Sequence, residues 1–231
     1  MKRVWLITAY WVAAALTFAG AVWLVFGWAP EERTMGIIQK VFYFHLPVAI
    51  NAFLACTVVG VGGIGYLLAR KPWWDDLAAA GAKVAVVLCS GVLLTGMMWA
   101  RIAWGHWWDW QSPRLTFSLM LWLLYVVYLI VRASVEGARR RAVVCAVYGL
   151  IAYLDIPLVY LSARLIRDER HPGNIILAAT SMKLTLAASF VPVTLLAAGL
   201  VVMQYQLHRR QRQERAEGSP ETGEHANGGV T

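Results

Sequence analysis

Apolar residues fall in six long runs along the chain, separated by short polar stretches. The runs cover about residues 4–28, 45–69, 77–100, 115–131, 142–163 and 175–206. Most of them approach or exceed the ~20 apolar residues that a helix needs to cross a bilayer, and the fourth is the shortest. Because backbone inside a bilayer must satisfy its own hydrogen bonds, the pattern predicts an all-α, polytopic membrane protein with six transmembrane helices.

Basic residues are shared unevenly between the two sides that such a topology creates. The denser set lies near residues 2–3, 70–71, 132–141 and 209–215, and the sparser set lies between the other pairs of helices. Lys and Arg favour the cytoplasmic side of a membrane. We therefore expect both termini in the cytoplasm and the connection between helices 3 and 4 on the outer face.

Composition supports a membrane protein with little soluble mass, because 59% of the residues are hydrophobic and only 15% are charged. The formal charge of +8 lies in short loops beside apolar runs, which argues against nucleic-acid binding. The first run resembles a signal peptide but is too long for one, so we expect a retained helix. The expected domains are a membrane domain over 1–207 and a disordered cytoplasmic tail over 208–231.

Small residues inside the runs have a structural interpretation. The glycines at 60, 62, 63 and 65 are typical of membrane helices that approach one another closely. Cys56, Cys89 and Cys145 show no CxxC or CxxCH spacing, so we expect buried apolar residues. The chain has no Walker motif, no Gly-x-Ser-x-Gly and no HExxH.

Tryptophan is concentrated in the connection between helices 3 and 4. Trp104, Trp107, Trp108 and Trp110 occupy four of seven positions, and we call residues 104–110 the tryptophan segment. Such a surface at a membrane boundary can cover a large, flat hydrophobic ligand. The alternative is an aromatic belt that anchors helices at the interface.

Two histidines are expected on the same outer face as the tryptophan segment. His45 stands at the start of the second apolar run, and His171 precedes the sixth. Imidazole is a good iron ligand, and a haem site needs axial ligands, an aromatic bed and cations near the propionates. Arg101 and Arg114 flank the tryptophan segment and could supply the cations. The alternative is a pair of solvated interfacial histidines, and His106 competes as a ligand.

One carboxylate, Asp155, lies within the fifth run, where an ionisable residue is a functional candidate. It precedes Pro157, so it could instead satisfy backbone groups that a kink sets free. The sequence leaves both interpretations open.

The stretch Trp104–Thr116, WGHWWDWQSPRLT, resembles the signature of the haem-handling protein family of cytochrome c maturation, which reads WGxWWxWD followed by Arg-Leu-Thr. The segments 41–49 and 153–160 also resemble that family, and the chain has the length of its six-helix CcmC members. Here Gln111 stands where the common pattern has an acid, and Asp109 lies earlier.

The resemblance implies a protein that binds haem b as cargo at the outer face of the bacterial inner membrane. His45 and His171 would be axial ligands, with the four tryptophans and the two arginines as further contacts. It also implies partners: a tethered haem chaperone (CcmE-like), ABC transporter subunits (CcmA-like and CcmB-like) and a small helper (CcmD-like). The protein would then not be an enzyme, because ATP hydrolysis would belong to its partners.

Two other functions remain open from the residues. A b-type cytochrome subunit in electron transfer would hold haem between mid-membrane histidines, and no histidine lies mid-run here. A haem-translocating transporter subunit would need polar sites inside the membrane, for which only Asp155 and Lys83 are candidates.

Overall fold

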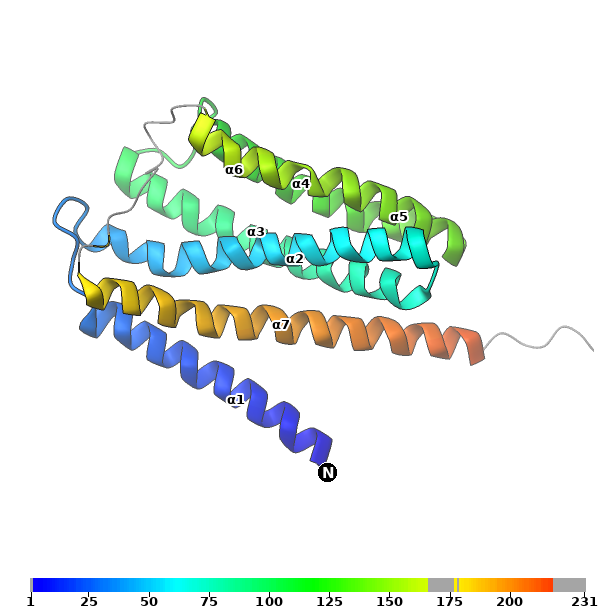
Figure 1. Ribbon diagram of the computed structural model, residues 1–231. Helices are drawn as coiled ribbons and strands as arrows, with labels where there is room; N and C mark the ends of the chain where they lie inside the picture. The colour runs from blue at the N-terminus through cyan, green and yellow to red at the C-terminus, as the bar shows by residue number, and fades with distance from the viewer. Residues whose placement is uncertain (1, 166–176, 178, 218–231) are drawn as a thin grey trace, which may run out of the picture.

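The computed structural model describes residues 2–165, 177 and 179–217, with side chains for 4–162, 177 and 179–215. Figure 1 shows that these ranges form a bundle of helices, as the sequence predicts. The elements in chain order are α1 (Lys2–Trp23), the π-helix η1 (Leu24–Trp28), the 3-10 helix η2 (Ile37–Val41), α2 (Phe42–Ala69), α3 (Pro72–Trp104), α4 (Pro113–Ser134), α5 (Ala138–Tyr153), α6 (Asp155–Leu165) and α7 (Thr180–Glu217).

Six segments of the described chain are long and apolar enough to cross a membrane, which confirms the expected number. They are Val4–Trp28, Ile37–Ala69, Pro72–Trp104, Pro113–Ser134, Ala138–Ser162 and Thr180–Arg215. Several begin or end beyond the apolar runs. In α3, for example, Asp75 lies in the first turn and Arg101 in the last. Both charges complement the helix dipole, so the helix extends past the apolar residues that revealed it.

The helices run roughly alongside one another (Figure 1). The α2–α3 hairpin packs against α7 and α5, and α4 packs against α3, α5 and α6. Helix α1 lies on the outside of the bundle against α7, where the Tyr10 hydroxyl donates to the Leu195 carbonyl at 2.5 Å. The first and last described residues lie toward the same side of the molecule in this view.

Glycines bring α2 close to its neighbours, as the sequence predicts. A Cβ on Gly62 would lie 2.9 Å from both the backbone nitrogen and the Cβ of Ala78 on α3. A Cβ on Gly63 would lie 3.1 Å from the Ala146 carbonyl oxygen on α5. Without a side chain at these positions, the helix backbones approach closely enough for dispersion contacts to hold them together.

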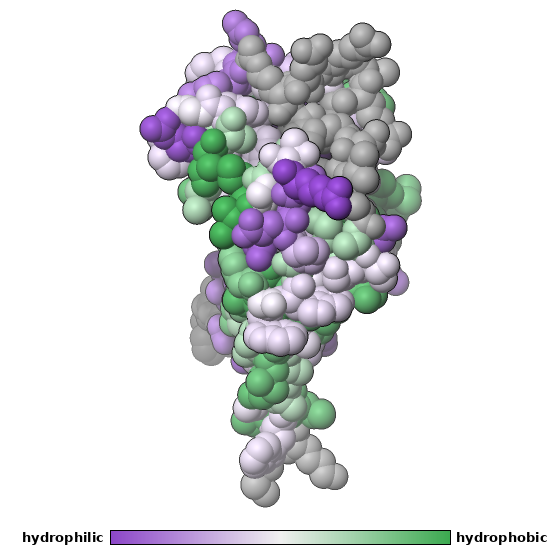
Figure 2. All heavy atoms as spheres, turned by 90° about the vertical axis from the view of Figure 1, so that its left-hand side faces the viewer, coloured by the Kyte–Doolittle hydropathy of each residue, from purple (hydrophilic) through white to green (hydrophobic). Residues whose placement is uncertain are grey.

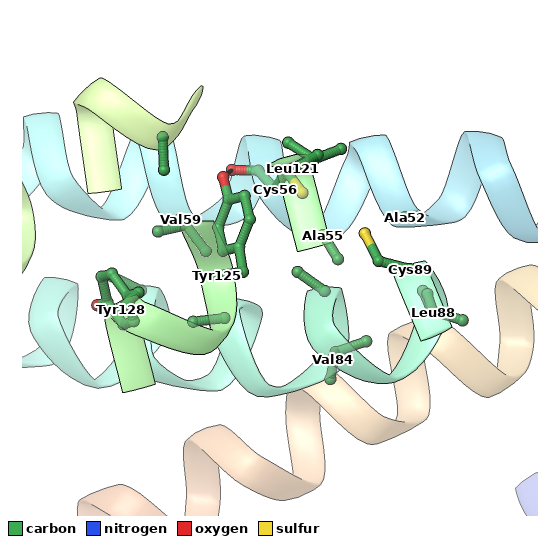
Figure 3. Close-up of a cluster of buried hydrophobic side chains, with 14 of the residues drawn as sticks. Ala52, Ala55, Cys56, Val59, Val84, Leu88, Cys89, Leu121, Tyr125 and Tyr128 are labelled. Atoms are coloured by element: carbon green, nitrogen blue, oxygen red, sulfur yellow. Dashed lines mark hydrogen bonds between the residues drawn. The ribbon is translucent and has the colours of Figure 1, made fainter. Parts of the chain in front are cut away.

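The cluster shown in Figure 3 lies between α2, α3 and α4. Tyr125 is fully buried there and its hydroxyl donates to the Cys56 carbonyl at 3.4 Å. All three cysteines are free and buried, in agreement with the apolar role expected for them.

The fifth predicted span is not one continuous helix. It divides into α5 and α6 at Leu154, whose N–H bonds to the Ile151 carbonyl at 3.1 Å. Pro157 explains the break, because it has no N–H to donate and its ring clashes with the carbonyl four residues earlier.

The described part of the chain also extends beyond residue 208, where the expected tail begins. Helix α7 continues to Glu217, so the first part of the tail is helical. Its Gln, Arg and Glu residues are good helix formers, and Arg212 makes an ion pair with Asp76 of α3. Residues 218–231 lie outside the described part of the chain.

Candidate functional site

The tryptophan segment is held between two helix ends. Gly105 ends α3 with a φ of +82°, and its N–H bonds to the Arg101 carbonyl at 3.2 Å. The Arg101 guanidinium in turn donates to the Gly105 carbonyl. Ser112 and Pro113 begin α4, where a proline without N–H is favoured. We call this end of the bundle the tryptophan end.

The turn inside the segment depends on Asp109. One of its carboxylate oxygens accepts a hydrogen bond from the Gln111 N–H at 2.9 Å, and its carbonyl accepts from the Ser112 N–H at 3.3 Å. Such local bonds are what Asp contributes to turns. This structural role accounts for an acid at position 109.

The tryptophan rings form facets that meet at angles. Trp108 and Trp110 pack edge to face at 5.7 Å between ring centroids, and Trp104 does the same with Trp99 of α3 at 5.1 Å. Trp107 and Trp110 are 58% and 72% exposed. The edge-to-face pair with Trp108 orients the ring of Trp110, so that its large apolar face stays presented at the surface.

A hollow of about 660 Å³ opens among these rings, within the range typical of small-molecule sites. Its lining consists of Trp104, His106, Trp108, Asp109, Trp110 and Gln111. The hollow thus gathers three of the four predicted tryptophans, while His45, Arg101, Arg114 and Trp107 do not line it. Figure 2 views this end of the molecule and shows hydrophilic residues interleaved with hydrophobic ones.

His45 lies in the first turn of α2 and is bonded to a residue of α3. Its Nδ1 is 2.8 Å from Oγ1 of Thr95. The Thr95 hydroxyl donates to the Gly91 carbonyl at 2.7 Å, so its oxygen is the acceptor toward the imidazole. This arrangement places the proton of His45 on Nδ1 and leaves Nε2 with a lone pair.

The end of α3 also makes room for the imidazole. A Cβ on Gly96 would lie 3.4 Å from Cε1 of His45, so a glycine here keeps the ring in contact without pressing on it. Sequence reasoning missed both Thr95 and Gly96, because a Thr-Gly pair inside an apolar run is common in membrane helices.

Arg114, Arg101 and Lys40 are among the described cations at the tryptophan end. Arg114 is in the first turn of α4 and within electrostatic range of His45. Arg101 is exposed in the last turn of α3, and its guanidinium has donors beyond the one that Gly105 uses. Lys40 is buried in η2, with its Nζ 5.7 Å from the centre of the Phe26 ring.

His171 lies outside the described residues, so the predicted histidine pair is not seen as such. The helices on either side of it are described: in Figure 1, α7 begins at the left-hand end of the bundle near the start of α2, and α6 ends at the upper left beside the start of α4.

Asp155 is 3% exposed at the start of α6. Neither of its carboxylate oxygens has a hydrogen-bond partner among the described residues. Within that part of the chain, the carboxylate therefore does not satisfy the backbone groups freed by Pro157.

Comparison with known proteins places the chain in a family. The family model described as Heme exporter protein C matches residues 2–219. The chain is 28% identical over 200 residues to Heme exporter protein C of Bradyrhizobium diazoefficiens, covering 86% of this chain and 74% of that protein.

Other relatives agree. Heme exporter protein C of Paracoccus denitrificans is 33% identical over 147 residues, covering 62% of this chain and 60% of that protein. A ccmC-like mitochondrial protein of cytochrome c biosynthesis from Marchantia polymorpha is 23% identical over 188 residues, covering 81% of this chain and 76% of that protein. With nearly its whole length matched by the family model, the chain belongs to the Heme exporter protein C family.

Proposed function

We propose that this protein binds haem at the tryptophan end and passes it on during cytochrome c maturation. The names of its relatives support haem as cargo and cytochrome c biogenesis as the process. The observation that carries the proposal is the bond between His45 and Thr95. It fixes the proton of one imidazole on Nδ1, so that Nε2 would be available to iron, at the same end of the bundle as the tryptophan segment.

A ligand held in this way suits haem iron. Histidines that bind metals generally donate their second ring nitrogen to an acceptor, which fixes the tautomer and raises the basicity of the ligating nitrogen. Thr95 is such an acceptor for His45. Five residues lie between Leu165 and His171, and these six steps along the chain reach at most about 20 Å. Helix α3 is about 50 Å long, so we assign the second axial ligand, His171, to the same end of the bundle.

The surroundings suit the rest of the macrocycle. The faces of Trp104, Trp108 and Trp110 are apolar and surround an open hollow, and Trp107 adds a further exposed ring. Arg114 and Arg101 would pair with the propionates. Haem b, which is held without covalent bonds to the protein, fits a cargo that must leave again. In this role the iron supplies the coordination bonds, and the chain orients and exposes the macrocycle.

The remaining steps require partners. An open hollow with exposed tryptophans suits transfer to a membrane-tethered chaperone of the CcmE type, which would dock on the same rings. The sequence carries no nucleotide-binding motif, so CcmA-like and CcmB-like subunits would supply ATP hydrolysis, with a CcmD-like helper. We place the protein in the bacterial inner membrane, with both termini in the cytoplasm and the haem site outside.

A b-type cytochrome is less well supported. Among the described residues, His45 and His106 lie at the tryptophan end, and His208 lies far along α7 toward the opposite end. This arrangement does not place two imidazoles on facing helices in mid-membrane.

Absorption spectra of the purified protein test the proposal. We expect a Soret band with added haem, which His45→Ala and His171→Ala each weaken strongly and their combination abolishes. His208→Ala is the matched control, because it removes an imidazole at the opposite end. A band that persists in the double variant, or that falls equally in the control, contradicts the proposal.

A further inference from the structure

A second concave site lies at the opposite end of the bundle, where α2 and α4 end and α3 and α5 begin. We call it the arginine pocket. It has a volume of about 690 Å³. It is lined by Tyr66, Arg70, Pro72, Asp75, Asp76, Arg132, Ala138, Arg139, Arg141, Ala142, His208, Gln211, Arg212 and Arg215. The length of α3, about 50 Å, separates it from the tryptophan segment.

Two ion pairs hold the pocket together. Arg132 of α4 binds Asp75 of α3 through both nitrogens, at 2.7 and 2.8 Å. Arg212 of α7 binds Asp76 at 2.7 and 3.0 Å. Three helices are thereby fixed relative to one another, and both acids of the lining are already paired.

Four arginines of the lining are left without a carboxylate. Arg70, Arg139, Arg141 and Arg215 make no ion pair with any described residue. Arg70 instead lies over the Tyr66 ring, at 5.9 Å from its centre. With six arginines against two aspartates, the lining carries a formal excess of four positive charges.

The start of α5 adds to this positive potential. Gly137 precedes the helix and offers no side-chain cap, and no acid lies in the first turn. Arg139 and Arg141, which line the pocket, lie in that turn instead, at the positive end of the helix dipole, where cations are disfavoured. His208 contributes a buried Nε2 with no partner among the described residues. An anion in the pocket would compensate all of these groups.

We propose that the arginine pocket binds the phosphate group of an anionic phospholipid. Arginine and free helix N–H groups are the usual donors to phosphate, and basic pockets between helix ends bind anionic headgroups. The pocket lies where four membrane helices begin or end, which is the depth of lipid headgroups. Tyr66 and Ala142 add apolar wall for the glycerol part of the ligand. A soluble phosphate shares this chemistry, so the experiment separates the two sources.

Native mass spectrometry of the full chain in detergent measures lipid binding. Phosphatidylglycerol, which is anionic, and phosphatidylcholine, which is zwitterionic, are added separately and compared. Arg139→Gln/Arg141→Gln removes two unpaired arginines of the pocket. Arg140→Gln/Arg210→Gln is the control, because it removes the same charge from neighbouring positions that do not line the pocket. We expect the pocket variant to bind phosphatidylglycerol at least about tenfold more weakly, and the control to resemble the unmodified protein.

Three outcomes overturn the proposal. They are equal retention of the two lipids, an equal loss in both double variants, and displacement of phosphatidylglycerol by millimolar inorganic phosphate or ATP, which would identify a soluble ligand. A melting temperature close to that of the unmodified protein excludes misfolding of the pocket variant. The haem spectrum is recorded in parallel. Because the two sites are at opposite ends, the lipid result stands whether or not haem binds at the tryptophan end.

Discussion

The imidazole Nδ1 of His45 lies 2.8 Å from the hydroxyl oxygen of Thr95, joining the first turn of α2 to the later part of α3. The Thr95→Val variant keeps the shape of the side chain and removes the acceptor. Loss of such an outer partner typically weakens metal binding 10–100-fold. We expect a fall of about that size in haem affinity, measured by titration of the Soret band.

The same prediction has a conservative control. Thr95→Ser retains the hydroxyl and should bind haem nearly as well as the unmodified protein. The reduction potential of the bound iron should shift in the valine variant alone, because the basicity of the ligating nitrogen changes. If valine and serine behave alike in both measurements, Thr95 does not position His45.

Close packing of α2 and α3 predicts a stability effect at Gly62. A methyl group there would lie 2.9 Å from the Ala78 backbone nitrogen, which cannot move without shifting the helix. Gly62→Ala should lower the free energy of unfolding by about 1–3 kcal/mol, as overpacking does. Gly20→Ala is the control, because nothing lies within 4 Å of its added Cβ. Chemical unfolding in detergent compares the two, and equal stabilities would contradict the packing argument.

The pair Arg132–Asp75 predicts a second stability effect. Both side chains are only 12% exposed, so Arg132→Gln leaves a carboxylate partly buried without its partner. Such losses cost about 3–5 kcal/mol, whereas removing both charges is much less harmful. The double variant Arg132→Gln/Asp75→Asn should therefore regain most of the lost stability in a thermal unfolding experiment. A double variant that is as unstable as the single one would show that the pair itself contributes the stability.

The connection between η1 and η2 should respond to acid. Oε2 of Glu32 accepts hydrogen bonds from the N–H groups of Met35 and Thr34, at 2.6 and 2.8 Å. These bonds, that of Met35 first, lower the pKa of Glu32 below its ordinary value of 4.5. A lowered pKa means that the charged form favours the folded turn above pH 4.5 and that this contribution is lost as pH falls through the folded pKa.

Amide hydrogen exchange of residues 34 and 35 measures this effect. Exchange, corrected for its intrinsic dependence on pH, should accelerate below pH 4.5 in the unmodified protein. Glu32→Gln should show fast exchange already at neutral pH and no further acid-dependent step. Protection that is independent of pH in the unmodified protein would refute the role of the carboxylate.

Two contacts between α2 and α3 could have been found from the sequence by counting residues away from the turn that joins these helices. His45 and Thr95 each lie 25 residues from Arg70, and Gly62 and Ala78 each lie 8 residues from it. Because two antiparallel α-helices have the same rise per residue, positions equally far from the turn lie at the same level along the hairpin axis. Counting gives only this level along the axis, however. The rotation of each helix about its own axis decides whether two side chains meet.

The sequence by itself determined the six membrane spans, the family and the identity of the candidate haem ligand on α2. It could do so because a bilayer offers the backbone no water, so that length and hydropathy are enough to reveal a helix. The tertiary structure decided that Thr95 orients His45, that the tryptophans form angled facets, and that four arginines of one pocket have no carboxylate partner among the described residues. These features depend on contacts between residues far apart in the chain, which the packing of the helices fixes and no local pattern encodes.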